Sequence, residues 1–339
     1  METPLSVTEQ SQISEARRHA VTTAQNNGLS ETLQNRAALV MTELATNLVK
    51  YGRGGEVIVR PCPAPGEPGL EILALDKGPG IASLEQSMND GFSTGNSLGF
   101  GLGAIARLSS HVDIHTSQGA GTAILARLTE DMPVDAAALP VRRRPIEVSG
   151  LTTAKAGQES CGDAWSARWV DGALWVVAVD GLGHGPQACY AATQAVAVFH
   201  QADGAATPYD IVRAAHKELK HTRGVVMAIA VVRPMLGTME FAGIGNISAV
   251  LVQNHEQRRL PSMDGIVGYS VRAIREQSYT WTPTSTLVLA SDGLSSRWNL
   301  AQQASLLARH PSLIAGVMHR DYARSTDDAT VAVAKGCPT

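Results

Sequence analysis

The sequence predicts a mixed α/β protein that is divided into two different domains. The chain has 339 residues, which is enough for two domains with hydrophobic cores. Segments up to residue 128 alternate between helical and strand patterns, whereas short apolar strands dominate after residue 147. Residues 129–147 contain three prolines and no hydrophobic periodicity, as is typical of a linker. We therefore expect a domain at 1–133, a linker at 134–147 and a second domain at 148–339.

The composition predicts a soluble globular protein with no nucleic-acid or membrane partner. Hydrophobic residues make up 44% of the chain, charged residues 17%, and the net charge is −3. The basic run at 142–144 is typical of a solvated linker, and no stretch approaches the roughly 18 apolar residues of a membrane span. The N-terminus has no apolar signal core, and the four cysteines are scattered without a CxxC pair. These features predict a cytoplasmic protein.

Residues 31–52 are predicted to form a helix with one buried face. Apolar residues recur there every three or four positions, Ser30 is a suitable N-cap, and Gly52 lies just past the end. Glu43 and Asn47 are four residues apart, so both project from the same face, beside the apolar stripe. A carboxylate and an amide so placed could share a metal ion and a water. The alternative is a hydrogen-bonded pair on the helix surface.

The segment 70–81 predicts a strand followed by a glycine turn. Apolar and other residues alternate along the strand, and Asp76 falls at its end. Gly78 and Gly80 would let the backbone approach a ligand closely. An aspartate at this place could accept a hydrogen bond from an exocyclic amine such as that of adenine. It could also simply begin a turn.

A glycine cluster precedes a further helix. Residues 91–103 contain five glycines, of which Gly99, Gly101 and Gly103 alternate with other residues. Glycine loses the most backbone entropy on ordering, so the cluster is either a flexible loop or a cradle for a phosphate group. The N-terminus of the helix that follows would offer unpaired N–H groups and a positive dipole end to such a group.

Taken in order, these segments resemble a known family. MTELATNLVKYG, DKGPGI and DGFSTGNSLGFGLGAIARL, within residues 31–128, resemble the Bergerat-type α/β sandwich of histidine kinases and gyrase-like ATPases, and most closely the RsbT-type serine kinases. The resemblance implies ATP and Mg²⁺ as cofactors, with Asn47 holding Mg²⁺, Glu43 acting as catalytic base and Asp76 reading adenine. It also implies glycines that shape the pocket and lid: Gly78, Gly80, Gly99, Gly101 and Gly103.

The second half places carboxylates at the ends of strands. They occur at four separate sites: Asp163, Asp180, Asp292, and the pair Asp327 and Asp328. Each Asp-Gly alone is typical of a turn. Since strand ends gather residues that are distant in sequence, we expect a shared acidic rim. Oxygen ligands without nearby His or Cys favour Mg²⁺ or Mn²⁺, and two such ions could activate a bridging water.

This half also resembles a known family. GDAW, VDGLGHG, FAGIGNISAVLV, GIVGY, ASDGL and DDATVAV, within residues 150–335, resemble in that order the SpoIIE and RsbX branch of the PP2C-type metallophosphatases. The resemblance implies a β-sandwich flanked by helices, two Mn²⁺ or Mg²⁺ ions, and catalytic roles for Asp180 and Asp292. The implied metal ligands are Asp163, Asp180, the Gly181 carbonyl, Asp292 and, in preference to Asp328, Asp327.

One family feature is missing from the sequence. Many eukaryotic members carry an arginine near the start of the domain that grips the substrate phosphate, and we find no counterpart of it here. His184, in the GLGHG turn, is either an acid to the leaving group or a structural residue.

Together the two resemblances imply a partner-switching regulator. The first half would phosphorylate, and the second dephosphorylate, a serine or threonine of a STAS-domain antagonist protein, with a sigma factor as a possible downstream partner. Two alternatives remain: the first half binds ATP and a partner without transferring phosphate, as an anti-sigma or docking module, or the second half is a degenerate phosphatase that only binds. The presence of Glu43 favours transfer, and the four acidic sites favour phosphatase activity.

Overall fold

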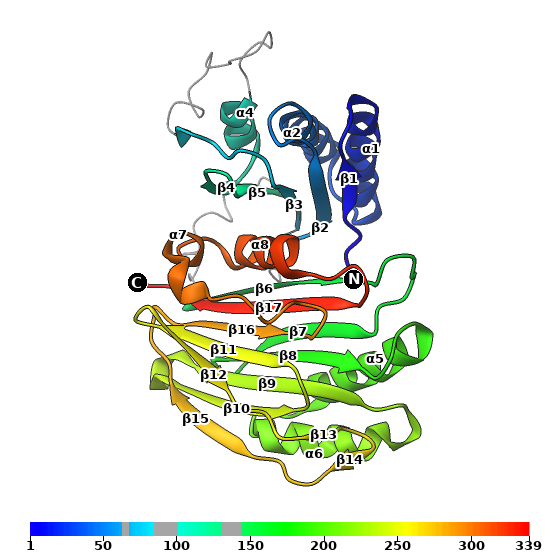
Figure 1. The fold of residues 1–339 in the computed structure, drawn as a ribbon, viewed down its shortest axis with the longest axis vertical. Helices are drawn as coiled ribbons and strands as arrows, with labels where there is room; N and C mark the ends of the chain where they lie inside the picture. Colours follow the sequence, from blue (N-terminus) through cyan, green and yellow to red (C-terminus); the bar gives the residue numbers. More distant parts are fainter. Residues whose placement is uncertain (63–67, 85–100, 131–143, 339) are drawn as a thin grey trace. The chain divides into compact units, whose positions relative to one another are not determined.

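The computed structural model describes residues 1–62, 68–84, 101–130 and 144–338, shown in Figure 1. The chain folds into two compact units, Glu2–Arg142 and Arg143–Thr339, with Met1 grouped with the second. Strand β6 (Ile146–Thr153) begins inside the range predicted as linker, because Ile146 already pairs with Gly336 of strand β17. No helix within the described ranges is long and apolar enough to cross a membrane.

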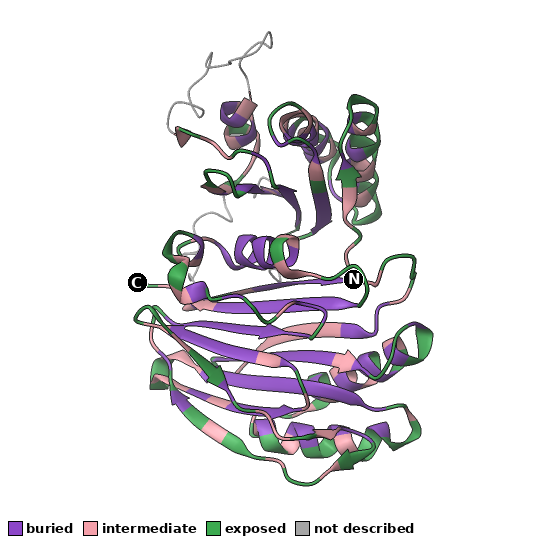
Figure 2. Cartoon of the chain, viewed as in Figure 1, coloured by how far each residue is buried: buried purple, intermediate pink, exposed green. Residues whose placement is uncertain are grey.

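The first unit is an antiparallel sheet with helices packed on one face. The strands lie in the order β1-β2-β3-β5-β4. In chain order the elements are β1 (Leu5–Val7), α1 (Gln10–Asn26), α2 (Glu31–Lys50), β2 (Gly55–Pro61), β3 (Gly69–Asp76), α4 (Gly101–Leu108), β4 (His111–Ser117) and β5 (Gly121–Thr129). Alternate residues of the strands form one core cluster with the apolar faces of the three helices. The buried residues of α2 recur every three or four positions along the helix, and Figure 2 colours buried residues purple.

Helix α2 confirms the predicted pattern, and α4 departs from it. Ser30 caps α2, its Oγ accepting a hydrogen bond from the Leu33 N–H at 3.2 Å. The prediction placed Gly101 and Gly103 in a loop ahead of the next helix, whereas α4 already begins at Gly101. A glycine costs more than alanine in a helix, but here the buried Leu102 and Ile105 hold the short helix against the core. Gly99 lies outside the described residues.

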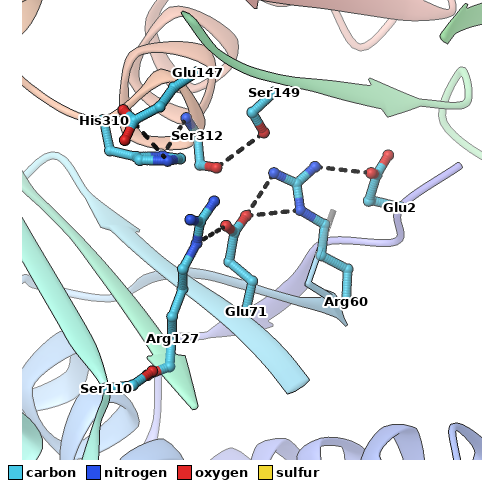
Figure 3. A network of polar contacts seen from close by, with 9 residues as sticks. All are labelled: Glu2, Arg60, Glu71, Ser110, Arg127, Glu147, Ser149, His310 and Ser312. Carbon is cyan, nitrogen blue, oxygen red and sulfur yellow. Dashed lines mark hydrogen bonds and ion pairs between the residues drawn. The ribbon is translucent and has the colours of Figure 1, made fainter. Parts of the chain in front are cut away.

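A cross-strand ion network joins the strands of this sheet (Figure 3). Arg60 of β2 and Arg127 of β5 stand directly opposite Glu71 of β3 in the strand register. Both arginines donate to the Glu71 carboxylate, at 2.6 and 2.8 Å, and Arg60 also reaches Glu2 at 3.0 Å. Opposite charges facing each other across strands stabilise a sheet register.

The second unit is a sandwich of two five-stranded sheets, ordered β15-β10-β9-β8-β7 and β12-β11-β16-β17-β6. After β6 come β7 (Asp163–Val170), β8 (Ala173–Gly181), α5 (Pro186–Gln201), α6 (Pro208–Glu218), η1 (Leu219–His221), β9 (Val225–Arg233), η2 (Pro234–Leu236), β10 (Thr238–Ile244), β11 (Ser248–Gln253), β12 (Glu256–Leu260), β13 (Gly265–Ile266), β14 (Ser270–Val271), β15 (Glu276–Thr280), β16 (Thr286–Ala290), η3 (Leu300–Gln302), α7 (Ala304–Leu307), α8 (Pro311–Tyr322) and β17 (Ala329–Gly336).

Two separate apolar clusters hold this unit together. One fills the space between the two sheets, and the other lies between the β8–β9 face and the helices α5 and α6. Helix α8 packs on β6 and β17 of the other sheet, where Ser312 donates to Ser149 at 2.9 Å (Figure 3). The predicted fold class, a two-domain α/β protein whose second domain is a β-sandwich flanked by helices, is therefore confirmed.

Candidate functional site

The structure fixes Asp76 of the first unit between two backbone segments. Asp76 is the last residue of β3 and is 9% exposed. Its Oδ1 accepts hydrogen bonds from the Gly78 N–H at 2.8 Å and from the Thr122 N–H of β5 at 3.1 Å. Because both donors belong to the main chain, the carboxylate is held in one orientation.

Glycines surround this carboxylate where a side chain would not fit. A Cβ atom on Gly52 would lie 2.9 Å from the Asp76 Cβ, and one on Gly78 would lie 2.9 Å from the Gly52 Cα. Gly80 has a φ of +78°, and its Cβ would lie 2.4 Å from the Ser117 carbonyl oxygen. The end of α2 and the turn after β3 therefore approach each other as closely as backbone permits.

Glu43 and Asn47 lie one turn apart on α2. Both are half-buried, and Asn47 accepts through its main-chain carbonyl from the Gly52 N–H at 3.1 Å. Their side chains make no hydrogen bond with each other or with any described part of the chain. Among the described residues, the surface pair that was the alternative to a ligand site is therefore not formed.

The glycines predicted to shape the pocket and lid lie in two different elements. Gly78 and Gly80 lie in the turn beside Asp76, whereas Gly101 and Gly103 belong to the first turn of α4. A Cβ atom on Gly101 would meet nothing within 4 Å. No packing constraint from the described residues explains that glycine.

In the second unit the predicted carboxylates lie at strand ends. Asp163 begins β7 and is the register partner of Asp180, near the end of β8. Asp292 follows β16, and Asp327 and Asp328 precede β17, the strand paired with β16. Two sheets thus contribute acidic side chains from strands that are more than a hundred residues apart in sequence.

The raised pKa values of Asp163 and Asp180 reflect electrostatic repulsion between these carboxylates. Burial is the largest cause that raises the pKa of Asp163 to about 7, opposed by a hydrogen bond from Ser291 and aided by three neighbouring carboxylates. Burial and the charges of the other four aspartates raise the pKa of Asp180 to about 8. Of these aspartates, Asp163 and Asp328 are buried. Carboxylates that repel one another in this way would be stabilised by a bound cation.

Neighbouring donors show which carboxylates are already used by the protein. Asp328 is 3% exposed, and its two oxygens accept from the N–H groups of Lys155 at 2.8 Å and Gly162 at 2.7 Å. Asp327 is exposed and accepts only one short-range bond, from the Asp328 N–H at 3.0 Å. The structure therefore gives Asp328 a main-chain-binding role and leaves Asp327 open to a ligand.

The donor set suits a hard cation, although no ready-made site is present. Within the described ranges no three His, Cys, Asp or Glu side chains stand in metal-binding geometry. Asp163 accepts from the Ser291 hydroxyl at 2.5 Å, and Asp292 accepts from the Asn246 amide at 2.8 Å. Carboxylate oxygens with a nearby main-chain carbonyl are the ligands that Mg²⁺ and Mn²⁺ prefer. The residues present fit such an ion.

Sequence reasoning missed the residues that orient these carboxylates. Ser291 and Asn246 were not singled out, nor was Thr122, whose N–H binds Asp76. Ser291 directly precedes Asp292, and Asn246 lies in the GIGNIS turn, so their motifs were visible. Their partners were not, since each bond joins segments far apart in the chain.

The fold and the two sites define a class: an ATPase-like α/β domain joined to a PP2C-like β-sandwich. Residues 6–128 match the histidine kinase-like ATPase domain, and residues 170–335 match the stage II sporulation protein E family. The serine/threonine-protein kinase RsbT of Bacillus subtilis (strain 168) is 38% identical over 93 residues, which are 27% of this chain and 70% of RsbT.

Solved structures extend the likeness to the second domain. A structure from work on "the bacterial stressosome: a modular system that has been adapted to control secondary messenger signaling" is 29% identical, covers 56% of this chain and 99% of its own, and has a TM-score of 0.53. RsbX in complex with magnesium shows the same fold at 18% identity and a TM-score of 0.50, with 56% of this chain and 95% of its own covered. The chain therefore belongs to the RsbT family through its N-terminal domain, fused to a SpoIIE-type PP2C domain.

Proposed function

We propose that this protein is a bifunctional partner-switching regulator. Its N-terminal domain transfers phosphate from ATP to a serine or threonine of a STAS-domain antagonist protein, and its C-terminal domain removes that phosphate. The observation that carries the proposal is the cluster of mutually repelling carboxylates in one domain, in a chain whose other domain is related to a serine/threonine kinase. A sigma factor downstream of the antagonist is part of the same proposal.

In the proposed kinase reaction, Asp76 accepts a hydrogen bond from the adenine amine while Gly78 and Thr122 hold its carboxylate still. Asn47 would hold Mg²⁺, which neutralises charge on the phosphates. Glu43, one turn away on α2 and free of protein partners in the described chain, takes the proton from the attacking hydroxyl. Their spacing on one helix face keeps base and metal ligand together.

In the proposed phosphatase reaction, Asp163, Asp180, the Gly181 carbonyl, Asp292 and Asp327 would hold two Mn²⁺ or Mg²⁺ ions. Such ions supply an activated water and neutralise the phosphoryl group. Ser291 and Asn246 orient Asp163 and Asp292 through their hydrogen bonds. Second-layer contacts of this kind typically affect metal affinity tenfold or more.

The test uses the full chain, candidate STAS-domain proteins from the same genome, labelled ATP and Mn²⁺. Wild type is compared with Glu43→Ala and Asp180→Asn, and phosphate on the partner is followed over time. We expect Asp180→Asn to accumulate phosphorylated partner and Glu43→Ala never to form it. Asp171→Asn is the matched control, because Asp171 is exposed in the β7–β8 turn at a φ of +48°, which asparagine tolerates.

Other outcomes separate the alternatives. If no variant labels the partner while wild type dephosphorylates a phosphopartner, the N-terminal domain is a docking module on a phosphatase. If wild type labels the partner but never releases the phosphate, the C-terminal domain is a binding module. Opposed activities in one chain would consume ATP without net effect, so we also expect one of them to be gated by a partner.

A further inference from the structure

An arginine with no side-chain partner among the described residues lies beside the turn that follows Asp180 and Gly181. A Cβ atom built on Gly183 would lie 3.2 Å from Nη1 of Arg223, so the guanidinium rests against the glycine turn between β8 and α5. Arg223 comes from a different segment, the connection between η1 and β9. No local pattern predicts this proximity, since forty residues separate the two positions.

The main chain holds this connection against the turn. The Leu182 N–H donates to the Gly224 carbonyl at 3.1 Å, and Gly181 pairs with Val225 in the strand register. The Thr222 hydroxyl accepts from the Gly224 N–H at 3.0 Å and donates to the Leu219 carbonyl at 2.7 Å. The backbone on both sides of Arg223 is therefore fixed relative to the proposed metal ligands.

Gly224 makes this approach possible. Its φ is +84°, and a Cβ atom there would lie 2.6 Å from Cγ2 of Ile266 and 2.7 Å from the Val267 carbonyl oxygen. Only glycine adopts that conformation without strain in so confined a place. The sequence TRGVV thus presents an arginine at a position set by the glycine after it.

The charge of Arg223 has no partner in the described part of the chain. The residue is exposed and makes no ion pair or hydrogen bond there through its side chain. Arg223 therefore lies against the turn that follows Asp180 and Gly181, with no ion pair to an aspartate among the described residues.

We propose that Arg223 binds the phosphate group of the phosphoprotein substrate and holds it over the metal-binding turn. This rests on the proposed phosphatase function. A guanidinium offers paired donors whose geometry matches two phosphate oxygens, and it stays charged at all working pH values. The phosphate would then lie between fixed arginine donors and the cations held by the carboxylates.

Arg324 is the competing cation. Its N–H donates to the Gly293 carbonyl at 2.9 Å, so its backbone also lies near Asp292. It is exposed on the loop before Asp327, and no contact among the described residues places its guanidinium against the turn. A comparison of equivalent substitutions at the two positions therefore decides which arginine grips phosphate.

The experiment measures hydrolysis of p-nitrophenyl phosphate and binding of inorganic phosphate by the full chain loaded with Mn²⁺. Loss of a charged hydrogen-bonding partner typically costs about tenfold to hundredfold in affinity. We expect Arg223→Gln to raise KM and the phosphate dissociation constant by at least about tenfold, with a smaller change in kcat. Arg223→Lys should recover part of the loss, because lysine keeps the charge but not the paired donors.

Arg275→Gln, at an exposed position before β15, is the control and should behave as wild type. Mn²⁺ affinity, measured by calorimetry, should be unchanged in Arg223→Gln, which separates phosphate binding from damage to the metal site. Wild-type KM and phosphate affinity in Arg223→Gln, or a rise in Arg324→Gln instead, would overturn the assignment. If wild type shows no hydrolysis and binds no phosphate, the proposed phosphatase function fails with it.

Discussion

The two domains use carboxylates in opposite ways. Asp76 is a single side chain whose Oδ1 accepts hydrogen bonds from two main-chain N–H groups. The neighbouring residues Gly52 and Gly78 have no side chains, so the main chain packs closely around it. In the second domain five aspartates crowd together, and burial and mutual repulsion raise the pKa of Asp163 and Asp180. The Asp76 carboxylate is already stabilised by hydrogen bonds from the protein, and it suits a neutral hydrogen-bonding ligand. The aspartates of the second domain repel one another, and bound cations would compensate that repulsion.

The largest expected effect is at the crowded site. Asp180→Asn removes one charge and one ligand oxygen, so we expect kcat/KM for p-nitrophenyl phosphate with Mn²⁺ to fall by about a hundredfold or more. ATP binding by the other domain should be unchanged in this variant. Phosphatase activity equal to that of Asp171→Asn would show that the acidic cluster is not the reaction centre.

The next effect is at the fixed carboxylate. Asp76→Asn keeps one oxygen for the Gly78 and Thr122 N–H groups but places an NH₂ donor where the adenine amine needs an acceptor. We expect ATP affinity, measured by calorimetry, to fall at least about tenfold.

Glu56→Gln, at an exposed position of β2 in the same sheet, is the matched control for this change. Phosphatase activity should be the same in both variants. Unchanged ATP affinity in Asp76→Asn would remove the adenine-binding role of this residue.

A pH titration tests the repulsion itself. The folded-state pKa values of Asp163 and Asp180 are about 7 and 8, against an ordinary value of 3.8, so the folded protein binds more protons across that window. Without metal, stability should therefore fall as pH rises from about 4 to about 8. The five tryptophans, at 165, 169, 175, 281 and 298, all lie in the second domain, so their fluorescence reports its unfolding alone.

We expect the tryptophan-monitored midpoint in chelator to drop by about 5 °C or more between pH 5 and pH 8. Asp180→Asn should flatten this dependence, and saturating Mn²⁺ should abolish it because the cation compensates the charges. A midpoint that rises with pH in chelator would contradict the raised pKa values.

The smallest expected effect is structural. Thr207 caps α6, which packs on β9 and β10, through a reciprocal pair of hydrogen bonds with Asp210 at 3.2 and 3.3 Å. Thr207→Ala should cost about 1 kcal/mol, which lowers the tryptophan-monitored midpoint by about 2–4 °C. Thr207→Ser keeps the cap and should stay near wild type. Catalytic constants should not change in either variant.

Local sequence rules determined the elements of this protein well. The apolar spacing of α2, its Ser30 cap, the strand ending at Asp76 and the proline-initiated α5 and α6 all follow from interactions within a few residues. The start of α4 was misplaced because its glycines argue against a helix, and the buried packing of Leu102 and Ile105 outweighs that preference.

By itself the sequence determined which residue types end the strands, because alternation and Asp-Gly turns are read locally. Tertiary structure alone decided the contacts of these residues. Asp328 accepts hydrogen bonds from the N–H groups of Lys155 and Gly162. The Ser291 hydroxyl donates to Asp163, and Arg223 lies against Gly183. Such contacts join segments brought together by sheet pairing. Their strength depends on burial and on neighbouring charge, which no local pattern contains.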